Sequence, residues 1–122
     1  MNVRNTERPI SWMKGARKAF EAFPVAVQVE VSHALSIVAE GRKPDNAKPL
    51  VGLGTGVMEL AIRYRGDAWR AVYALRIADA VWVIHAFQKK SKSGIATPKP
   101  DIDLIKQRLK RAVEISKDRK KE

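Results

Sequence analysis

The chain has 122 residues, of which 45% are apolar, enough for a single hydrophobic core and too many for a disordered chain. Its 24 Lys and Arg residues outnumber its 13 Asp and Glu residues, which gives a formal net charge of +11 at pH 7. A domain this basic usually meets nucleic acid, ribosomes, an anionic membrane or an acidic partner. The absence of cysteine excludes disulfides and thiolate chemistry, and the absence of a long apolar run or leader segment predicts a cytoplasmic protein without a membrane span.

Two helices are predicted near the N-terminus. The first begins near Lys14, after a segment at residues 9–13 that suits either a short edge strand or the lead-in to a helix. Pro24 ends this helix and can occupy the first turn of the next one. The second helix carries one apolar stripe at helical spacing and stops near Gly41. The residues of that stripe are Val27, Val31, Ala34, Leu35 and Val38.

Three strands of an antiparallel meander follow a turn-rich connection at residues 41–56. The first strand, at residues 57–65, alternates apolar and mostly charged residues, which predicts one face toward the core and one charged face. A tight turn at residues 66–67 leads to the second strand, expected at residues 69–77. The third strand, at residues 81–87, is apolar on both faces, so we place it in the interior of the sheet.

The last predicted element is a helix that starts near Asp101 and whose apolar stripe ends at Val113. Asp101 or Asp103 can stabilise the positive end of this helix. Because the residues beyond Val113 are mostly charged, we divide the chain into one domain at residues 1–113 and a flexible tail at residues 114–122. The sequence thus predicts an α+β domain with an antiparallel sheet, two N-terminal helices on its apolar face and a C-terminal helix.

A cluster of lysines follows the third strand, which suits the binding of a polyanion. Lys89, Lys90 and Lys92 belong to this cluster, and residues 80–100 contain no carboxylate that would cancel their charge locally. Lys89 and Lys90 can bind phosphate directly, or transfer a proton if burial and neighbouring charges lower the pKa. The alternative is that consecutive lysines merely keep the end of the strand soluble. We favour a functional role for Lys89 and Lys90.

Three arginines flank the first turn of the meander. Arg63 and Arg65 are expected on the charged face of the first strand, and Arg70 begins the second strand close by. For any one of these arginines, a solvated strand face is the simpler interpretation. As a cluster, they are equally consistent with contacts to phosphate.

His85 is the candidate acid or base of the sequence, because imidazole titrates near neutral pH. It lies between Ile84 and Ala86 in an apolar strand, and a histidine in that setting is more often hydrogen-bonded inside the core. His33, on the second helix, is interpreted as structural. Both interpretations of His85, as a catalytic and as a core residue, remain open at this stage.

No pattern in the sequence indicates a metal or a cofactor. Asp101 and Asp103 could mimic a metal-binding pair, but at the start of a helix they more simply stabilise its end. The GLGTG stretch at residues 52–56 could be mistaken for a phosphate-binding loop. It lacks the following Gly-Lys-Ser/Thr and precedes a strand rather than a helix, so we interpret it as a turn. We therefore expect neither a metal nor a cofactor.

Two stretches carry a resemblance to known proteins. They read KPLVGLGTGVMELAIRYRGDAWRAVY at residues 48–73 and VWVIHAFQKKSKSGIATPKPDIDLIKQRLKRA at residues 81–112. With the order of two helices, meander and helix, they resemble the RelE/ParE toxin superfamily of bacterial toxin–antitoxin systems, in its phage-derived, HigB-like branch. The resemblance covers residues 10–112 and implies a RelE-like sheet, similar to that of microbial RNases, with basic residues on its open face.

The resemblance implies a ribosome-dependent mRNA endonuclease, a hydrolase-type toxin that inhibits translation. Related enzymes cut the codon in the ribosomal A site, with the 2′-hydroxyl of the mRNA as nucleophile and no metal. Arg63 and Arg70 match basic strand positions of RelE-type enzymes, and Lys90 falls near a functional arginine after the last strand. Ala61 departs from a basic position of that pattern, and no tyrosine follows Tyr73 where such enzymes often use one. The general base therefore stays open.

Seven residues are the predicted site under this resemblance. The catalytic candidates are Lys89, Lys90, Arg70 and His85, and the candidates for RNA or phosphate contact are Arg63, Arg65 and Lys92. The implied partners are a cognate helix-turn-helix antitoxin and the ribosome with its mRNA and rRNA. The resemblance also leaves open a ParE-like inhibitor of DNA gyrase, which would need no chemistry, and a third possibility is a basic binding module that has lost its toxicity.

Overall fold

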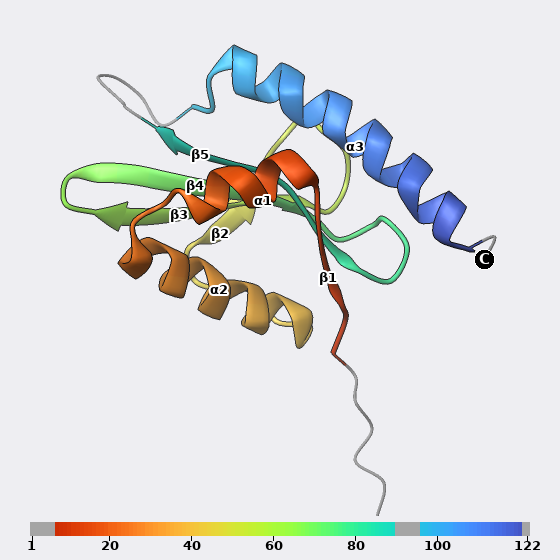
Figure 1. The fold of residues 1–122 in the computed structure, drawn as a ribbon, viewed down its shortest axis with the longest axis horizontal. Helices are drawn as coiled ribbons and strands as arrows, with labels where there is room; N and C mark the ends of the chain where they lie inside the picture. Colours follow the sequence, from red (N-terminus) through yellow and green to blue (C-terminus); the bar gives the residue numbers. More distant parts are fainter. Residues whose placement is uncertain (1–6, 90–95, 121–122) are drawn as a thin grey trace, which may run out of the picture.

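The computed structural model describes residues 7–89 and 96–120, and Figure 1 shows their fold. The elements in chain order are β1 (Ile10–Trp12), α1 (Lys14–Glu21), α2 (Val25–Ala39), β2 (Ala47–Pro49), β3 (Val57–Tyr64), β4 (Asp67–Ala74), β5 (Val81–Lys89) and α3 (Lys99–Lys120). Within these described residues, every helix is too short or too polar to cross a membrane. The order of helices and strands is the predicted one, with β1 in the segment where an edge strand was one of two predictions and with β2 as an added short strand.

The strands form one five-stranded sheet in the order β1-β5-β4-β3-β2. β3, β4 and β5 form the predicted antiparallel meander, and β2 extends it as an antiparallel edge strand. β1 pairs with β5 in parallel at the other edge, so residues 9–13 contain a short edge strand that leads directly into α1. β5 lies between β1 and β4, which agrees with a strand that is apolar on both faces.

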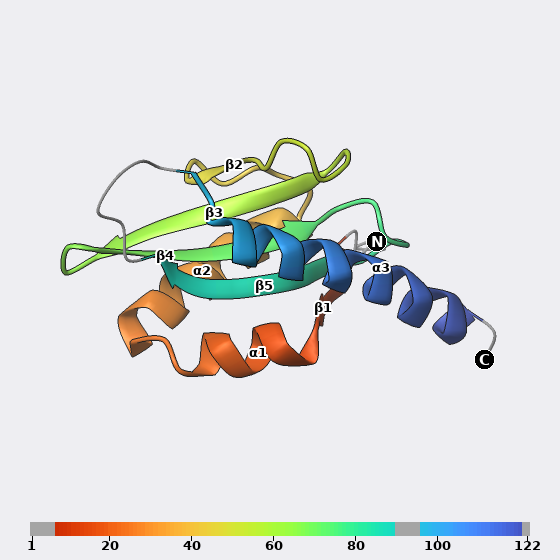
Figure 2. The ribbon, with the colours of Figure 1, turned by 90° about the horizontal axis from the view of Figure 1, so that it is seen from above.

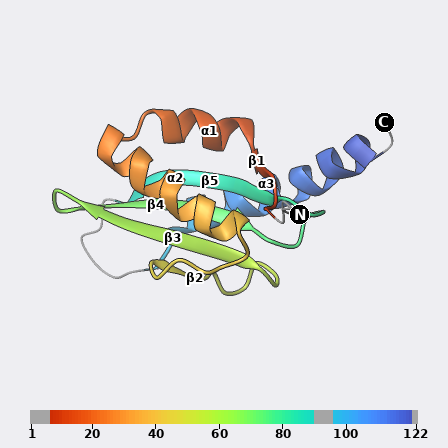
Figure 3. The same cartoon turned by 90° about the horizontal axis from the view of Figure 1, so that it is seen from below.

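The two faces of the sheet carry different helices. Figure 2 shows α3 in front of the sheet and α2 behind it, and Figure 3 shows α2 in front in the opposite view. α1 runs beside β5 in both views. We call the face covered by α2 the core face and the face on which α3 lies the polar face. The predicted α+β fold, with two N-terminal helices packed on the sheet and a C-terminal helix, is confirmed.

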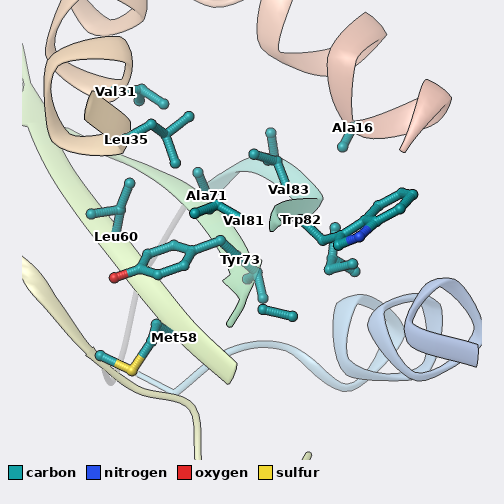
Figure 4. Close-up of a cluster of buried hydrophobic side chains, with 14 of the residues drawn as sticks. Ala16, Val31, Leu35, Met58, Leu60, Ala71, Tyr73, Val81, Trp82 and Val83 are labelled. Atoms are coloured by element: carbon teal, nitrogen blue, oxygen red, sulfur yellow. The ribbon is translucent and has the colours of Figure 1, made fainter. Parts of the chain in front are cut away.

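The core face is closed by apolar packing, as Figure 4 shows. Leu60 of β3 and Tyr73 of β4 are almost completely buried, as are Val31 and Leu35 of α2. Burying an apolar side chain of this size contributes about 1.5–3 kcal/mol relative to leaving it exposed. Burial also raises the pKa of Tyr73 to about 12, because the ionised phenolate is poorly solvated there. The apolar stripe predicted for the second helix is therefore the stripe that holds α2 on the sheet.

The turn between β3 and β4 differs from the prediction by one residue. β3 ends at Tyr64 and β4 begins at Asp67, so the turn consists of Arg65 and Gly66. Both have positive φ, 52° and 83°, which is the pattern of a type I′ hairpin turn. Arg65 is consequently a turn residue and not a strand residue, and its guanidinium lies 5.3 Å from the centre of the Tyr64 ring.

The C-terminal helix is longer than predicted. α3 begins at Lys99 and continues to Lys120, whereas the sequence indicated an end near Val113. Ile115 packs against the core, and the Arg119 guanidinium lies 5.0 Å from the centre of the Trp82 ring. These contacts, and the good helix propensity of Lys, Arg and Glu, explain why the helix continues. The division of the chain at residue 113 stays a prediction.

Candidate functional site

The register of the strands places several polar residues side by side on the polar face. Residues directly opposite each other in an antiparallel pair project from the same face of a sheet. Three such rows cross the polar face. The rows are Lys48, Glu59, Val72 and His85; Ala61, Arg70 and Phe87; and Arg63, Ala68 and Lys89. Four of the predicted site residues thus lie in adjacent rows of one surface.

A buried ion pair occupies the centre of this surface. The Arg70 guanidinium donates from Nη1 to Oε1 of Glu59 at 2.8 Å, and both side chains are at most 6% exposed. The hydroxyl of Thr97, in the segment before α3, donates to the other carboxylate oxygen of Glu59 at 2.7 Å. A carboxylate removed from water is tolerated only with partners of this kind. Glu59 therefore fixes the orientation of Arg70 and joins the sheet to the start of α3.

Lys89, at the end of β5, lies in the electrostatic field of this pair. Its side chain is 6% exposed, and its pKa is lowered, first by burial and next by the positive charges of Arg70 and Lys48. The negative charge of Glu59 acts in the opposite direction. A lysine with a lowered pKa holds its proton less tightly, as a lysine that transfers protons must.

The exposed cations of the polar face surround this centre. Arg63 is exposed near the end of β3, in the same row as Lys89, and Lys48 is exposed on β2, directly opposite Glu59. We call Lys48, Arg63, Arg70 and Lys89 the basic cluster. Arg65, which was predicted to join them, lies in the turn beside Tyr64.

His85 is engaged at both of its ring nitrogens. Nδ1 is 3.1 Å from Nη1 of Arg108, and Nε2 is 2.7 Å from Oδ1 of Asp101. A guanidinium can only donate, so Nδ1 accepts and Nε2 carries the proton that it donates to Asp101. Burial lowers the pKa of His85, while its hydrogen bond and charge interaction with Asp101 act against that shift and the charge of Arg108 adds to it. In this arrangement His85 holds α3 on β5.

The remaining predicted residues do not join the cluster within the described chain. Lys90 and Lys92 lie outside the described residues. Asp101 contacts His85, whereas Asp103 pairs with Lys99 at 3.1 Å on the surface, so the two aspartates do not share a site. Across residues 7–89 and 96–120, no three His, Asp or Glu side chains are grouped closely enough to hold a metal ion.

Sequence reasoning missed the residues that organise the site. Glu59 was assigned to the charged face of its strand but not to the site, although it is the only acidic residue of β3. Thr97 and Arg108 carry no local signal, because their partners are 38 and 23 residues away in the chain. Lys48 was assigned to a connection, and its short strand β2 is what brings it opposite Glu59.

The fold is similar to that of known toxins. It matches a mutant of toxin RelE from Escherichia coli in the free state, with a TM-score of 0.56 and 19% identity, over 86% of this chain and 97% of that chain. A chain of the toxin–antitoxin complex RelBE2 from Mycobacterium tuberculosis matches with a TM-score of 0.46 and 19% identity, over 74% of this chain and all of that chain. No curated protein matches the chain. The first similarity places the protein in the RelE-like fold class.

The family is shown by the sequence itself. Residues 18–110 match the family of phage-derived, Gp49-like proteins (DUF891), and this match spans well over half of the chain. The chain therefore belongs to the Gp49-like family. Together, family and fold confirm the predicted membership of the RelE/ParE superfamily, in its phage-derived, HigB-like branch.

Proposed function

We propose that this protein is a toxin that inhibits translation by cutting ribosome-bound mRNA, as a metal-independent endonuclease. The observation that supports the proposal most strongly is the basic cluster, which gathers Lys48, Arg63, Arg70 and Lys89 from four strands onto one face of the sheet. The net charge of +11 favours association with mRNA and rRNA. The reaction would take place in the cytoplasm, on the ribosome.

The basic cluster is suited to the binding of a phosphodiester. Arg63 and Lys48 are exposed and can contact the backbone of RNA. Arg70 is fixed by Glu59 before any RNA arrives, so its charge stabilises the pentavalent phosphate without reorganisation. Ala61 and Ala68, whose side chains are small, lie between these cations, and the scissile phosphate would be placed over them.

Cleavage requires two proton transfers. The 2′-oxygen attacks the neighbouring phosphorus, its proton passes to a base, the bond to the 5′-oxygen breaks, and that oxygen takes up a proton. The products are a 2′,3′-cyclic phosphate and a free 5′-hydroxyl. The lowered pKa of Lys89 makes its amine the proposed acceptor of the 2′-proton. Lys90 is the proposed donor to the leaving oxygen, and Lys92 a contact to rRNA. We assign no proton transfer to His85, because both of its nitrogens are engaged.

Primer extension on mRNA in a purified translation system tests this function. We expect cuts at A-site codons that require ribosomes and that disappear in the double variant Lys89→Ala/Lys90→Ala. The matched control is Lys14→Ala/Lys18→Ala, which removes the same charge from exposed positions of α1 and should still cut. Intact mRNA in the presence of folded wild-type protein would contradict the nuclease proposal.

A gyrase inhibitor is the second candidate function. It is favoured by the engagement of Arg70 and His85 in internal contacts, because a protein that acts only by binding needs no reactive side chain. Inhibition of supercoiling by purified gyrase, without ribosome-dependent cleavage, would select this function. For either activity, the proposed partner is a helix-turn-helix antitoxin with an acidic or amphipathic segment that covers the basic cluster.

A further inference from the structure

Phe87 is an aromatic side chain in the middle of the polar face. Phe87 and Trp82 both project from this face. Phe87 is half-buried, whereas Trp82 is only 1% exposed. Phe87 is directly opposite Arg70 on β4, and the next row of the sheet contains Arg63 and Lys89. A partly open ring is thus surrounded by the basic cluster.

The ring of Phe87 is held in place by His85. The two rings are stacked, with their centroids 5.0 Å apart and their planes inclined by 19°. His85 cannot turn freely, because Asp101 and Arg108 engage its two nitrogens. The orientation of Phe87 is therefore supported by a buried polar network that extends to α3.

Arg108 belongs to α3 and is held by contacts with two other elements, β5 and α1. Its Nη1 atom also donates to the carbonyl oxygen of Ile84 at 3.1 Å, just beyond the part of β5 that pairs with β1. Its guanidinium lies so close to Gly15 of α1 that a Cβ atom at that position would clash with it. The contacts with α1 and β5 thus fix Arg108, and through it the plane of the His85 ring.

We propose that Phe87 is a stacking platform for a base of single-stranded RNA, and that Asp101, His85 and Arg108 position its ring. The ligand class rests on the proposed function. An aromatic face beside cations that follow the backbone is the combination by which proteins hold single strands without reading their sequence. Successive rows on one face are about 7 Å apart along a strand, so a nucleotide whose base stacks on Phe87 can place its phosphate near Arg63 and Lys89.

The alternative is that Phe87 only fills space at the edge of the core. Two variants separate these roles. Phe87→Leu keeps an apolar side chain but has no ring, and Phe87→Tyr keeps the ring. If Phe87 only fills space, Phe87→Leu should bind RNA at least as well as Phe87→Tyr. If Phe87 is a stacking platform, only Phe87→Tyr should keep RNA binding. Thermal unfolding of both variants checks that they remain folded.

The test is the binding of a short single-stranded RNA that contains 2-aminopurine, whose fluorescence is quenched on stacking. We expect quenching by the wild type and by Phe87→Tyr. For Phe87→Leu we expect the quenching to be lost and the affinity to fall about tenfold, within the range for base–aromatic stacking. Arg63→Gln should weaken binding and reduce the salt slope by about one, with quenching retained at saturation.

Arg108→Lys tests the positioning network. It keeps the positive charge but cannot donate to both Ile84 and His85 in the same geometry. We expect weaker quenching at saturating RNA with an unchanged salt slope.

Equal quenching by the wild type and Phe87→Leu, or no quenching by the wild type, would overturn the proposal that Phe87 is a stacking platform. The binding assay contains no ribosomes. If the protein quenches the RNA fluorescence as expected but does not cut mRNA in the translation system, only the nuclease proposal is contradicted.

Discussion

On the core face the sheet meets α2 through apolar side chains, whereas on the polar face it meets Thr97 and α3 through hydrogen bonds and ion pairs in addition to apolar contacts. The charged and histidine side chains that are buried in the described part of the chain are all on the polar face. These residues are Glu59, Arg70, His85 and Lys89. The two faces of one sheet are thus buried by different interactions.

The difference indicates which face has a role beyond folding. Replacing a buried ion pair by apolar residues of similar size is often neutral or stabilising, so the pair of Glu59 and Arg70 is weak evidence for stability. The core face shows that this chain can cover a sheet with apolar residues alone. A charged network on the other face, next to exposed Arg63 and Lys48, therefore supports the proposal that the polar face binds RNA.

The largest expected effect comes from breaking the buried ion pair. Glu59→Ala removes the carboxylate from Arg70 and from the hydroxyl of Thr97, and should lower the free energy of unfolding by about 3–5 kcal/mol. The double variant Glu59→Leu/Arg70→Met should recover most of that loss, because it leaves no uncompensated charge. Denaturant unfolding measures both. Equal destabilisation in the single and double variants would mean that the charges themselves stabilise the fold.

A somewhat smaller loss is expected from the core face. Leu60→Ala leaves a cavity under α2 and should reduce the free energy of unfolding by about 3 kcal/mol, within the usual range for such truncations. RNA affinity at a temperature where the variant is folded should be unchanged, because Leu60 projects away from the basic cluster. A folded Leu60→Ala protein with weakened RNA binding would show that the two faces are coupled.

The smallest effect is expected from the protonation of His85. Its pKa is lowered in the folded state from the ordinary value of 6.5, chiefly by burial. As the pH falls below 6.5, the unfolded chain binds this proton first, so stability present above that pH is lost on acidification. The uptake of one proton changes the free energy of unfolding by at most about 1.4 kcal/mol per pH unit. Unfolding measured from pH 7.5 to 5 should be less pH-dependent in His85→Gln than in the wild type. A variant with the same slope would contradict this assignment.

Local patterns in the sequence predicted most of the fold. Period-two alternation identified β3 and β4, a continuous apolar run identified β5, and the stripe from Val27 to Val38 identified α2, because these patterns depend on burial against a single core. The turn at Arg65 was misplaced by one residue, since a residue other than Gly with positive φ has no strong local signature. β2 was missed because its three residues pair only through tertiary contacts.

The site was less predictable than the fold. Arg63, Arg70 and Lys89 were singled out by charge, and the structure places them on one face. Their organisation depends on Glu59, whose ion pair with Arg70 follows from strand register, and on Thr97 and Arg108, whose partners are distant in the chain. A bulge in β5 adds to the difficulty. Val72 pairs with His85 and Tyr73 with Val83, so the alternation of faces is interrupted within one strand.

The parallel pairing of β1 with β5 has a consequence for the order in which the chain is synthesised. Ile10 leaves the ribosome about 70 residues before its partner Val81, so the edge of the sheet cannot close until most of the chain has been translated. Thr97, Asp101 and Arg108 follow later still, and they complete the contacts of Glu59 and His85. A nascent chain therefore carries α1 and α2 early and acquires an organised polar face only after α3 has been translated.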